Sequence, residues 1–147
     1  MTWFVYSAWE GEAKLELFRN YGLNVIPGDG FLPAVVPSAV ASWILLLKRF
    51  GTMRLSDVLV PAVELAEEGF PMYDSLHRSI AGNTERFLKE WPSSAEVFLP
   101  EGKPPPLGMI FRQPDLAATF RRLLTAESGF GRDEGLRAAH DEFYRGR

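Results

Sequence analysis

The sequence predicts a mainly helical chain. Apolar residues recur at intervals of three and four over several long segments, which is the spacing of one face of an α-helix. Strand signals are few, and residues 3–7, with the sequence Trp-Phe-Val-Tyr-Ser, predict one short strand. These observations indicate about five or six helices and little sheet.

The first helix is expected over residues 10–21, with Gly22 as a left-handed cap at its C-terminal end. Three apolar residues share its inward face, namely Ala13, Leu17 and Phe18. Residues 25–36 contain two prolines and two glycines and therefore predict a turn with brief extended pieces. Residues 38–49 form the next helix, which is apolar almost all round and thus typical of a helix buried on several sides.

Ser56 is expected to cap a third helix, which has Pro61 near its start and ends at Gly69. Its predicted buried stripe is Val58, Ala62, Leu65 and Ala66. Asp74 is expected to cap a fourth helix. The pair Gly82-Asn83 weakens the middle of that helix by about 1 kcal/mol relative to alanine and favours a break there.

Residues 93–98 predict a short turn, and residues 100–106, with three consecutive prolines, predict an irregular surface connection. Pro114 then occupies the first position of a helix that continues over residues 115–124. Its expected inward residues are Leu116, Phe120, Leu123 and Leu124. A last helix is expected over residues 133–144, with one face formed by Leu136, Ala139, His140 and Phe143.

Length and composition exclude several classes of protein. The 147 residues, 46% of them hydrophobic, suit one domain or part of one. A net charge of -3 argues against nucleic acid as a partner, because no basic excess is available to neutralise phosphates. The absence of cysteine excludes disulfides, thiolate zinc sites and a cysteine nucleophile. No apolar run approaches the ~18 residues of a membrane span and no signal peptide is visible, so neither membrane nor compartment is indicated.

Five short motifs follow one another in the order of a known enzyme family. The most informative is Phe50-Gly51-Thr52-Met53, which leads into a helix that ends Leu65-Ala66 and Gly69-Phe70. The other four are Val36-Pro37-Ser38, Phe98-Leu99-Pro100-Glu101-Gly102, Gln113-Pro114-Asp115-Leu116-Ala117 and Phe143-Tyr144-Arg145-Gly146. Over about residues 22–146 the chain resembles the large subunit of the gamma-glutamyltransferases, also called glutathione hydrolases.

The resemblance implies that residues 1–147 are a partial large-subunit domain, the helical part of the αββα sandwich of N-terminal-nucleophile hydrolases. The whole enzyme would cleave and transfer gamma-glutamyl groups of a small-molecule substrate without a cofactor, through a threonine that begins the small subunit. That threonine lies downstream of any match, so the missing small-subunit half is the implied partner. No catalytic residue is expected here, since none of the threonines has the family's sequence context: Thr2, Thr52, Thr84, Thr119 and Thr125.

Glu12 is the one residue at an implied substrate-binding position. The family places there an arginine that pairs with the α-carboxylate of the glutamyl group, whereas this chain has Glu12, followed by Lys14 where proline is expected. Either the specificity departs from gamma-glutamyl compounds or the resemblance begins only at Gly22. His77 and His140 lack partners at metal-ligand spacing and predict structural or surface positions, so no metal is expected.

Three further interpretations bear on function. The acidic residues Glu64, Glu67 and Glu68 lie opposite an apolar stripe and predict a solvated helix face. A non-catalytic helical binding or scaffold module remains an alternative to the enzyme fragment. A fragment of a related acylase, such as a cephalosporin acylase, is the other alternative.

Overall fold

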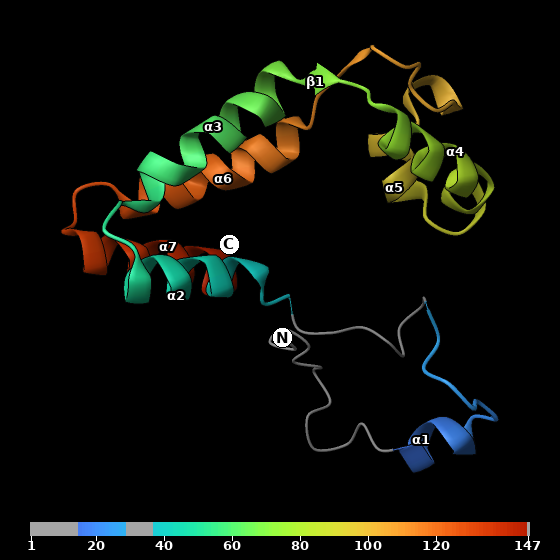
Figure 1. The fold of residues 1–147 in the computed structure, drawn as a ribbon, viewed down its shortest axis with the longest axis horizontal. Helices are drawn as coiled ribbons and strands as arrows, with labels where there is room; N and C mark the ends of the chain where they lie inside the picture. The colour runs from blue at the N-terminus through green and yellow to red at the C-terminus, as the bar shows by residue number, and fades with distance from the viewer. Residues whose placement is uncertain (1–14, 29–36, 147) are drawn as a thin grey trace. The chain divides into compact units, whose positions relative to one another are not determined.

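The computed structural model describes residues 15–28 and 37–146, which are almost entirely helices and their connections (Figure 1). The chain divides into two units, residues 1–52 and residues 53–147. The mainly helical prediction is therefore confirmed. The strand expected over residues 3–7 lies outside the described residues.

The first unit contains α1 (Leu15–Asn20) and α2 (Ala39–Phe50). Helix α1 ends where the sequence predicts, because Gly22 has a φ of 73° and the backbone N–H of Leu23 bonds back to the carbonyl of Phe18. Ser38 precedes α2 as expected. The two faces of α2 differ: its buried residues are Val40 and Ile44, and its exposed large side chains are Trp43, Leu45, Leu46 and Phe50.

A bundle of three helices forms one part of the second unit. Helix α3 (Leu55–Glu68) packs along α6 (Pro114–Glu127), and α6 packs against α7 (Arg132–Arg145) (Figure 1). Its buried apolar side chains come from all three helices: Leu55, Leu59, Val63, Ala66, Ala117, Leu123, Leu136 and Ala139. Pro114 opens α6 and the last helix is found as predicted, but Leu116, which was expected to point inward, is exposed.

Two predictions for α3 were wrong. The residue at the N-terminal cap is Arg54, and Ser56 already lies inside the helix. The buried stripe is Leu55, Leu59, Val63 and Ala66, so Ala66 alone is shared with the predicted stripe. Periodicity misplaced the stripe because α3 has apolar side chains on two adjacent faces, and spacing alone does not say which face meets α6.

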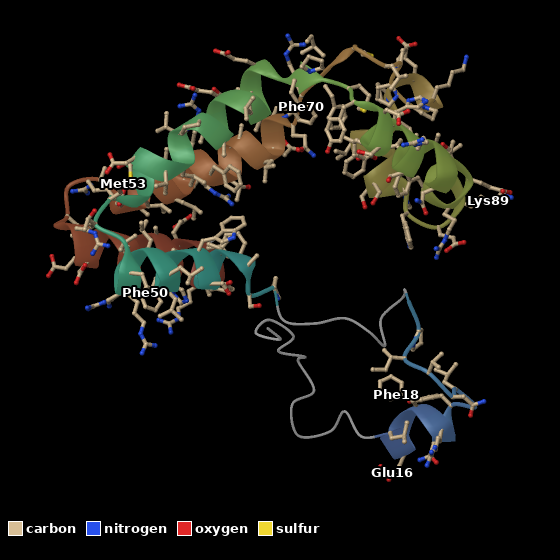
Figure 2. The ribbon with its side chains drawn as sticks, viewed as in Figure 1. Glu16, Phe18, Phe50, Met53, Phe70 and Lys89 are labelled. Carbon is tan, nitrogen blue, oxygen red and sulfur yellow. The ribbon has the colours of Figure 1, made fainter. Side chains whose placement is uncertain are left out.

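The other part of the second unit is a smaller lobe, joined to the bundle where Phe70 follows α3 (Figure 2). Its elements are β1 (Phe70–Pro71), α4 (Asp74–Lys89), α5 (Pro92–Phe98), the 3₁₀ turn η1 (Pro100–Gly102) and β2 (Ile110–Phe111). The two short strands pair antiparallel, with Phe70 opposite Phe111 and Pro71 opposite Ile110. The buried cluster of the lobe consists of Met72, Ile80, Leu99 and Phe111, with Phe87 and Phe98 packed against it.

The break predicted at Gly82-Asn83 is wrong, because α4 continues through this pair as one helix. Packing outweighs the low helix propensity of this pair, because Ile80 lies before it in the buried cluster and Phe87 packs on the same cluster after it. Asp74 is the first helical residue and Tyr73 the cap, which corrects the second cap prediction. The turn expected over residues 93–98 is also a helix, α5, begun by Pro92.

The proline-rich connection before β2 is mostly irregular, as predicted, apart from η1. Glu101 in η1 has a left-handed backbone with a φ of 60°, and Gly102 follows with a φ of 74°. Among the described residues no helix is both long and apolar enough to cross a lipid bilayer.

Candidate functional site

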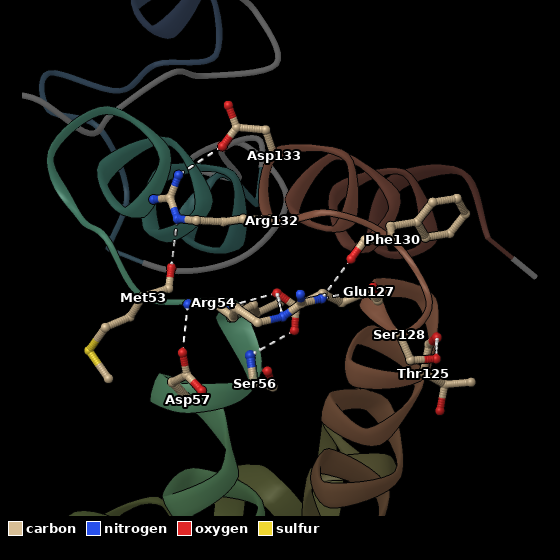
Figure 3. A network of polar contacts seen from close by, with 11 residues as sticks. Met53, Arg54, Ser56, Asp57, Thr125, Glu127, Ser128, Phe130, Arg132 and Asp133 are labelled. Atoms are coloured by element: carbon tan, nitrogen blue, oxygen red, sulfur yellow. Dashed lines mark hydrogen bonds and ion pairs between the residues drawn. The ribbon is translucent and has the colours of Figure 1, made fainter.

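A network of polar contacts joins the start of α3 to the end of α6 (Figure 3). Its centre is Glu127, the last residue of α6, whose side chain is only 1% exposed. The two carboxylate oxygens accept hydrogen bonds from the backbone N–H groups of Leu55 (2.7 Å) and Ser56 (2.8 Å). Such N–H groups have no partner within their own helix, so Glu127 caps α3 from a neighbouring helix and places its negative charge at the positive end of the helix dipole.

Arg54 completes the network. Its Nη2 donates to the carbonyl oxygens of Phe130 (3.1 Å) and Glu127 (3.4 Å), and its Nε lies 3.8 Å from the Glu127 carboxylate. The backbone N–H of Arg54 donates to Oδ2 of Asp57 (2.8 Å). The segment that leads into α3 is thereby tied to the turn between α6 and α7.

The geometry of this network indicates a structural role, which is to hold the start of α3 against the end of α6. Every buried side-chain nitrogen or oxygen in the described residues has a hydrogen-bond partner. The space around Glu127 is also filled, because a Cβ at Gly135 would lie only 2.7 Å from its Cγ. A carboxylate that accepts a backbone hydrogen bond at each oxygen and is enclosed in this way stabilises the helix junction and is not accessible to a substrate.

Sequence analysis missed Glu127. A glutamate in the last turn of a helix, before Ser128-Gly129, is ordinarily a solvated residue, and nothing in its neighbourhood indicates burial. The partners that bury it are more than seventy residues away in the chain, so only the tertiary structure identifies it.

The threonine hydroxyl groups of the helices bond within their own helices. Oγ1 of Thr84, Thr119 and Thr125 donates to the backbone carbonyl four residues earlier, at 3.1, 2.9 and 2.9 Å respectively. Nucleophilic catalysis requires a hydroxyl whose proton is taken by a neighbouring base. These three hydroxyl groups have no such partner in their hydrogen bonds.

Both histidines make ordinary structural contacts. Nδ1 of His77 lies 2.9 Å from the carbonyl oxygen of Pro105 and so holds the proline-rich connection against α4. His140 packs on the ring of Tyr144, and its Nδ1 lies 3.3 Å from Oδ1 of Asp141. Within the described part of the chain, no three His, Cys, Asp or Glu side chains are grouped as metal ligands.

The acidic residues of α3 lie on its exposed face, as predicted: Glu64, Glu67 and Glu68. Glu67 is paired with Arg121 of α6 through two hydrogen bonds. The hydrogen bond from the Arg121 guanidinium lowers the pKa of Glu67 below its usual value of 4.5. This pair links two helices at the surface and is not a carboxylate site.

An open pocket of about 470 Å³ lies between α5 and the start of α6. Its lining combines both charges with apolar side chains: Glu96, Val97, Arg112, Gln113, Pro114, Asp115, Leu116 and Thr119. None of these residues is buried, and none was singled out from the sequence as a ligand. Glu12, the residue at the implied substrate position, lies outside the described residues.

Comparison with known proteins now identifies the family. The sequence profile described as Gamma-glutamyltranspeptidase matches residues 10–147. The chain belongs to the gamma-glutamyltranspeptidase family. The match contains Glu12, the helices of both units and the Phe50-Gly51-Thr52-Met53 motif.

Individual members of the gamma-glutamyltranspeptidase family agree with this assignment. The chain is 40% identical over 98 residues to the acylase ACY 1 proenzyme of Pseudomonas sp. strain SE83, covering 67% of this chain and 17% of that one. It is 38% identical over 109 residues to the glutathione hydrolase-like YwrD proenzyme of Bacillus subtilis, covering 74% and 20%. The Helicobacter pylori gamma-glutamyltranspeptidase structure matches with a TM-score of 0.70 at 31% identity, over 82% of this chain and 35% of that one.

Proposed function

We propose that the chain is the helical part of the large subunit of a glutathione hydrolase-like enzyme that cleaves and transfers gamma-glutamyl groups. The family match over residues 10–147 carries this proposal. In it, residues 1–147 form a partial large-subunit domain, and the four-layer αββα sandwich is completed by further polypeptide. The chain spans 17% and 20% of the length of the two curated relatives described above, which leaves most of such an enzyme to other segments.

The contribution of this chain is a scaffold. The described residues supply a hydrogen-bonded junction of α3 and α6 at Glu127, and helices whose threonine hydroxyl groups are bonded internally. The nucleophile is proposed to be a threonine freed at the start of a small subunit, whose own α-amine acts as its base. Both curated relatives are described as proenzymes, which supports a second half as the partner.

An acylase is the alternative that a specific observation favours. The acylase from Pseudomonas is as similar to this chain as the glutathione hydrolase-like protein from Bacillus, at 40% and 38% identity. Glu12 also replaces the arginine that the resemblance places against the glutamyl carboxylate. A carboxylate there would repel a gamma-glutamyl group and tolerate an uncharged acyl group.

The test uses the longest polypeptide translated from the gene that encodes this chain. We expect it to process itself into two subunits and to release nitroaniline from gamma-glutamyl-nitroanilide, and to lose both activities when the threonine at the new N-terminus is changed to alanine. Hydrolysis of an acyl cephalosporin without release of nitroaniline would establish the acylase alternative. Absence of processing and of both activities would support the non-catalytic module.

Glu12→Arg in the same polypeptide separates the two specificities. If Glu12 occupies the place of the carboxylate-binding arginine, the substitution replaces repulsion by a charge-assisted contact of about 1.5–3 kcal/mol. We then expect the KM for glutathione to fall at least about tenfold. An unchanged KM would show that Glu12 does not face the substrate and that the resemblance begins only after it.

A further inference from the structure

The open pocket between α5 and the start of α6 lies where the lobe joins the bundle. The chain leaves the bundle through β1 and returns through β2, and these two strands pair with each other. The lobe supplies Glu96 and Val97 to the pocket, and the segment that follows β2 supplies the rest of the lining. The pocket volume of about 470 Å³ falls within the range of small-molecule sites, about 300–1,000 Å³, and such sites occur preferentially where two parts of a protein meet.

Three charged side chains of opposite sign line this pocket without pairing. They are Arg112, Glu96 and Asp115, and none of them forms a side-chain hydrogen bond or an ion pair with another described residue. Arg121, farther along α6, does pair, with Glu67 of α3. The pocket therefore presents one positive and two negative groups that are separate from one another.

The side chain of Arg112 is supported at its base by Gly69. A Cβ at Gly69 would lie 2.8 Å from Cγ of Arg112 and 2.7 Å from the backbone oxygen of Phe111. Gly69 also has a φ of 87°, so the position favours glycine on both counts. The base of Arg112 is thus packed at the junction of α3 and β2, which lowers the loss of side-chain entropy when a ligand binds the guanidinium.

The charges and the apolar side chains of the pocket fit a small zwitterion. A carboxylate suits Arg112, because a guanidinium group binds a carboxylate through two parallel hydrogen bonds. An ammonium group suits Glu96 and Asp115 for reasons of charge. Val97 is 41% exposed and Leu116 is 40% exposed, so both offer apolar surface to a hydrocarbon side chain. A ligand with only one charged group would leave a charge of the pocket without a partner.

We propose that this pocket binds a free α-amino acid with an aliphatic side chain. The carboxylate of the ligand pairs with Arg112, and its ammonium group pairs with Glu96 and Asp115. The aliphatic side chain packs on Val97 and Leu116. The inference goes beyond the proposed function and does not depend on it, because it concerns binding and not the cleavage of a gamma-glutamyl or acyl group.

Titration of L-leucine into the isotope-labelled 147-residue chain tests the proposal. Binding is measured as NMR shifts of the backbone amides of Val97 and Leu116, and we expect the shifts to saturate. Two further probes keep the side chain of leucine but lack one charge: 4-methylpentanoate has no ammonium group, and 3-methylbutylamine has no carboxylate. We expect each of them to bind at least about fivefold more weakly than leucine.

Substitutions assign the two charged contacts. Arg112→Gln should weaken the binding of leucine about fivefold without weakening that of 3-methylbutylamine, and Glu96→Gln should weaken leucine without weakening 4-methylpentanoate. A general loss of folding would weaken all three probes together, so this selectivity reports on the contacts themselves. Arg137→Gln is the matched control, since Arg137 is an exposed arginine of α7 that also forms no ion pair with a described residue. It should leave the binding of leucine unchanged.

Each of four results would overturn the proposal. Shifts that stay linear in leucine concentration would show that there is no site, and equal affinity for leucine and a singly charged probe would show that the pocket does not recognise a zwitterion. Equal effects of Arg112→Gln and Arg137→Gln would remove Arg112 from the site. Binding that is present in the 147-residue chain but lost in the longest polypeptide from the gene would show that other polypeptide fills the pocket. Failure of the proposed function is a separate matter, because none of these measurements requires hydrolase activity.

Discussion

A single carboxylate joins distant parts of the second unit. Glu127 belongs to α6 but accepts hydrogen bonds from the first N–H groups of α3. Arg54, in the segment that precedes α3, forms an ion pair with the same carboxylate. Arg132 adds a bond from its Nε to the carbonyl oxygen of Met53 (3.0 Å). The family motif that ends at Met53 is therefore followed directly by the hydrogen bonds that attach the start of α3 to α6 and α7.

Glu127→Gln should destabilise the chain. The amide retains one acceptor oxygen, and its NH₂ group would face an N–H donor of α3 across a buried contact. We expect the free energy of unfolding to fall by about 2 kcal/mol, measured by urea denaturation. Glu64→Gln, on an exposed face, is the matched control and should change it by less than about 0.5 kcal/mol. Equal effects of the two substitutions would show that the capping bonds contribute nothing.

At the scale of single elements, the long helices were predictable, whereas the short helix α5 and the N-terminal caps of α3 and α4 were not. Spacing of apolar residues located α2, α3, α4, α6 and α7 because each helix buries a face over several turns. The caps of α3 and α4 were displaced because Ser56 and Asp74 lie inside the helices, and the cap of α3 comes from Glu127, which no local pattern indicates. The wrong stripe of α3 has a similar origin, since the choice of face depends on α6.

Substitution of two helical glycines by alanine should change the free energy of unfolding in opposite directions. A Cβ at Gly82 of α4 would meet no atom within 4 Å, so Gly82→Ala should raise the free energy of unfolding by about 1 kcal/mol through helix propensity. A Cβ at Gly135 of α7 would lie 3.0 Å from the backbone oxygen of Glu127 and 2.7 Å from its Cγ. Gly135→Ala should therefore lower it by about 1–3 kcal/mol. Thermal and urea unfolding measure both, and stabilisation by Gly135→Ala would contradict the close packing at the joint.

The ion pair between α3 and α6 should contribute to the pH dependence of stability. The pKa of Glu67 is lowered in the folded chain by its hydrogen bond to Arg121, so the pair stabilises the fold above pH 4.5 and loses its effect as the pH falls through the lowered pKa. Glu67→Gln should lower the urea midpoint slightly at neutral pH and leave it unchanged in strong acid. The effect is small because the pair is exposed to solvent. Glu68→Gln controls for loss of charge on the same helix. If the urea midpoint depends on pH in the same way for both variants, the pair with Arg121 does not contribute to the pH dependence of stability.

At the scale of the whole molecule, the order of motifs was more informative than any predicted element. Five short motifs in register indicated the family, and the profile match over residues 10–147 confirms it. The polar centre was less predictable for a physical reason: the residues that bury Glu127 lie more than seventy residues away from it in the chain. Glu12 stays a prediction, and the polar centre that the structure does show, at Glu127, is a joint between helices.

The whole chain alone should have no hydrolase activity. The threonines of α4 and α6 donate their hydroxyl groups to helix carbonyls, and each oxygen of the buried Glu127 carboxylate accepts a backbone N–H group. Neither these threonines nor Glu127 is therefore arranged as an activated nucleophile and its base. We expect the purified 147-residue chain to release nitroaniline from gamma-glutamyl-nitroanilide no faster than buffer does. Thr52→Ala and Thr2→Ala, outside those helices, are made alongside it. If the chain releases nitroaniline above background and either substitution abolishes that release, the nucleophile lies in this chain. The proposed small-subunit half would then not be needed for the reaction.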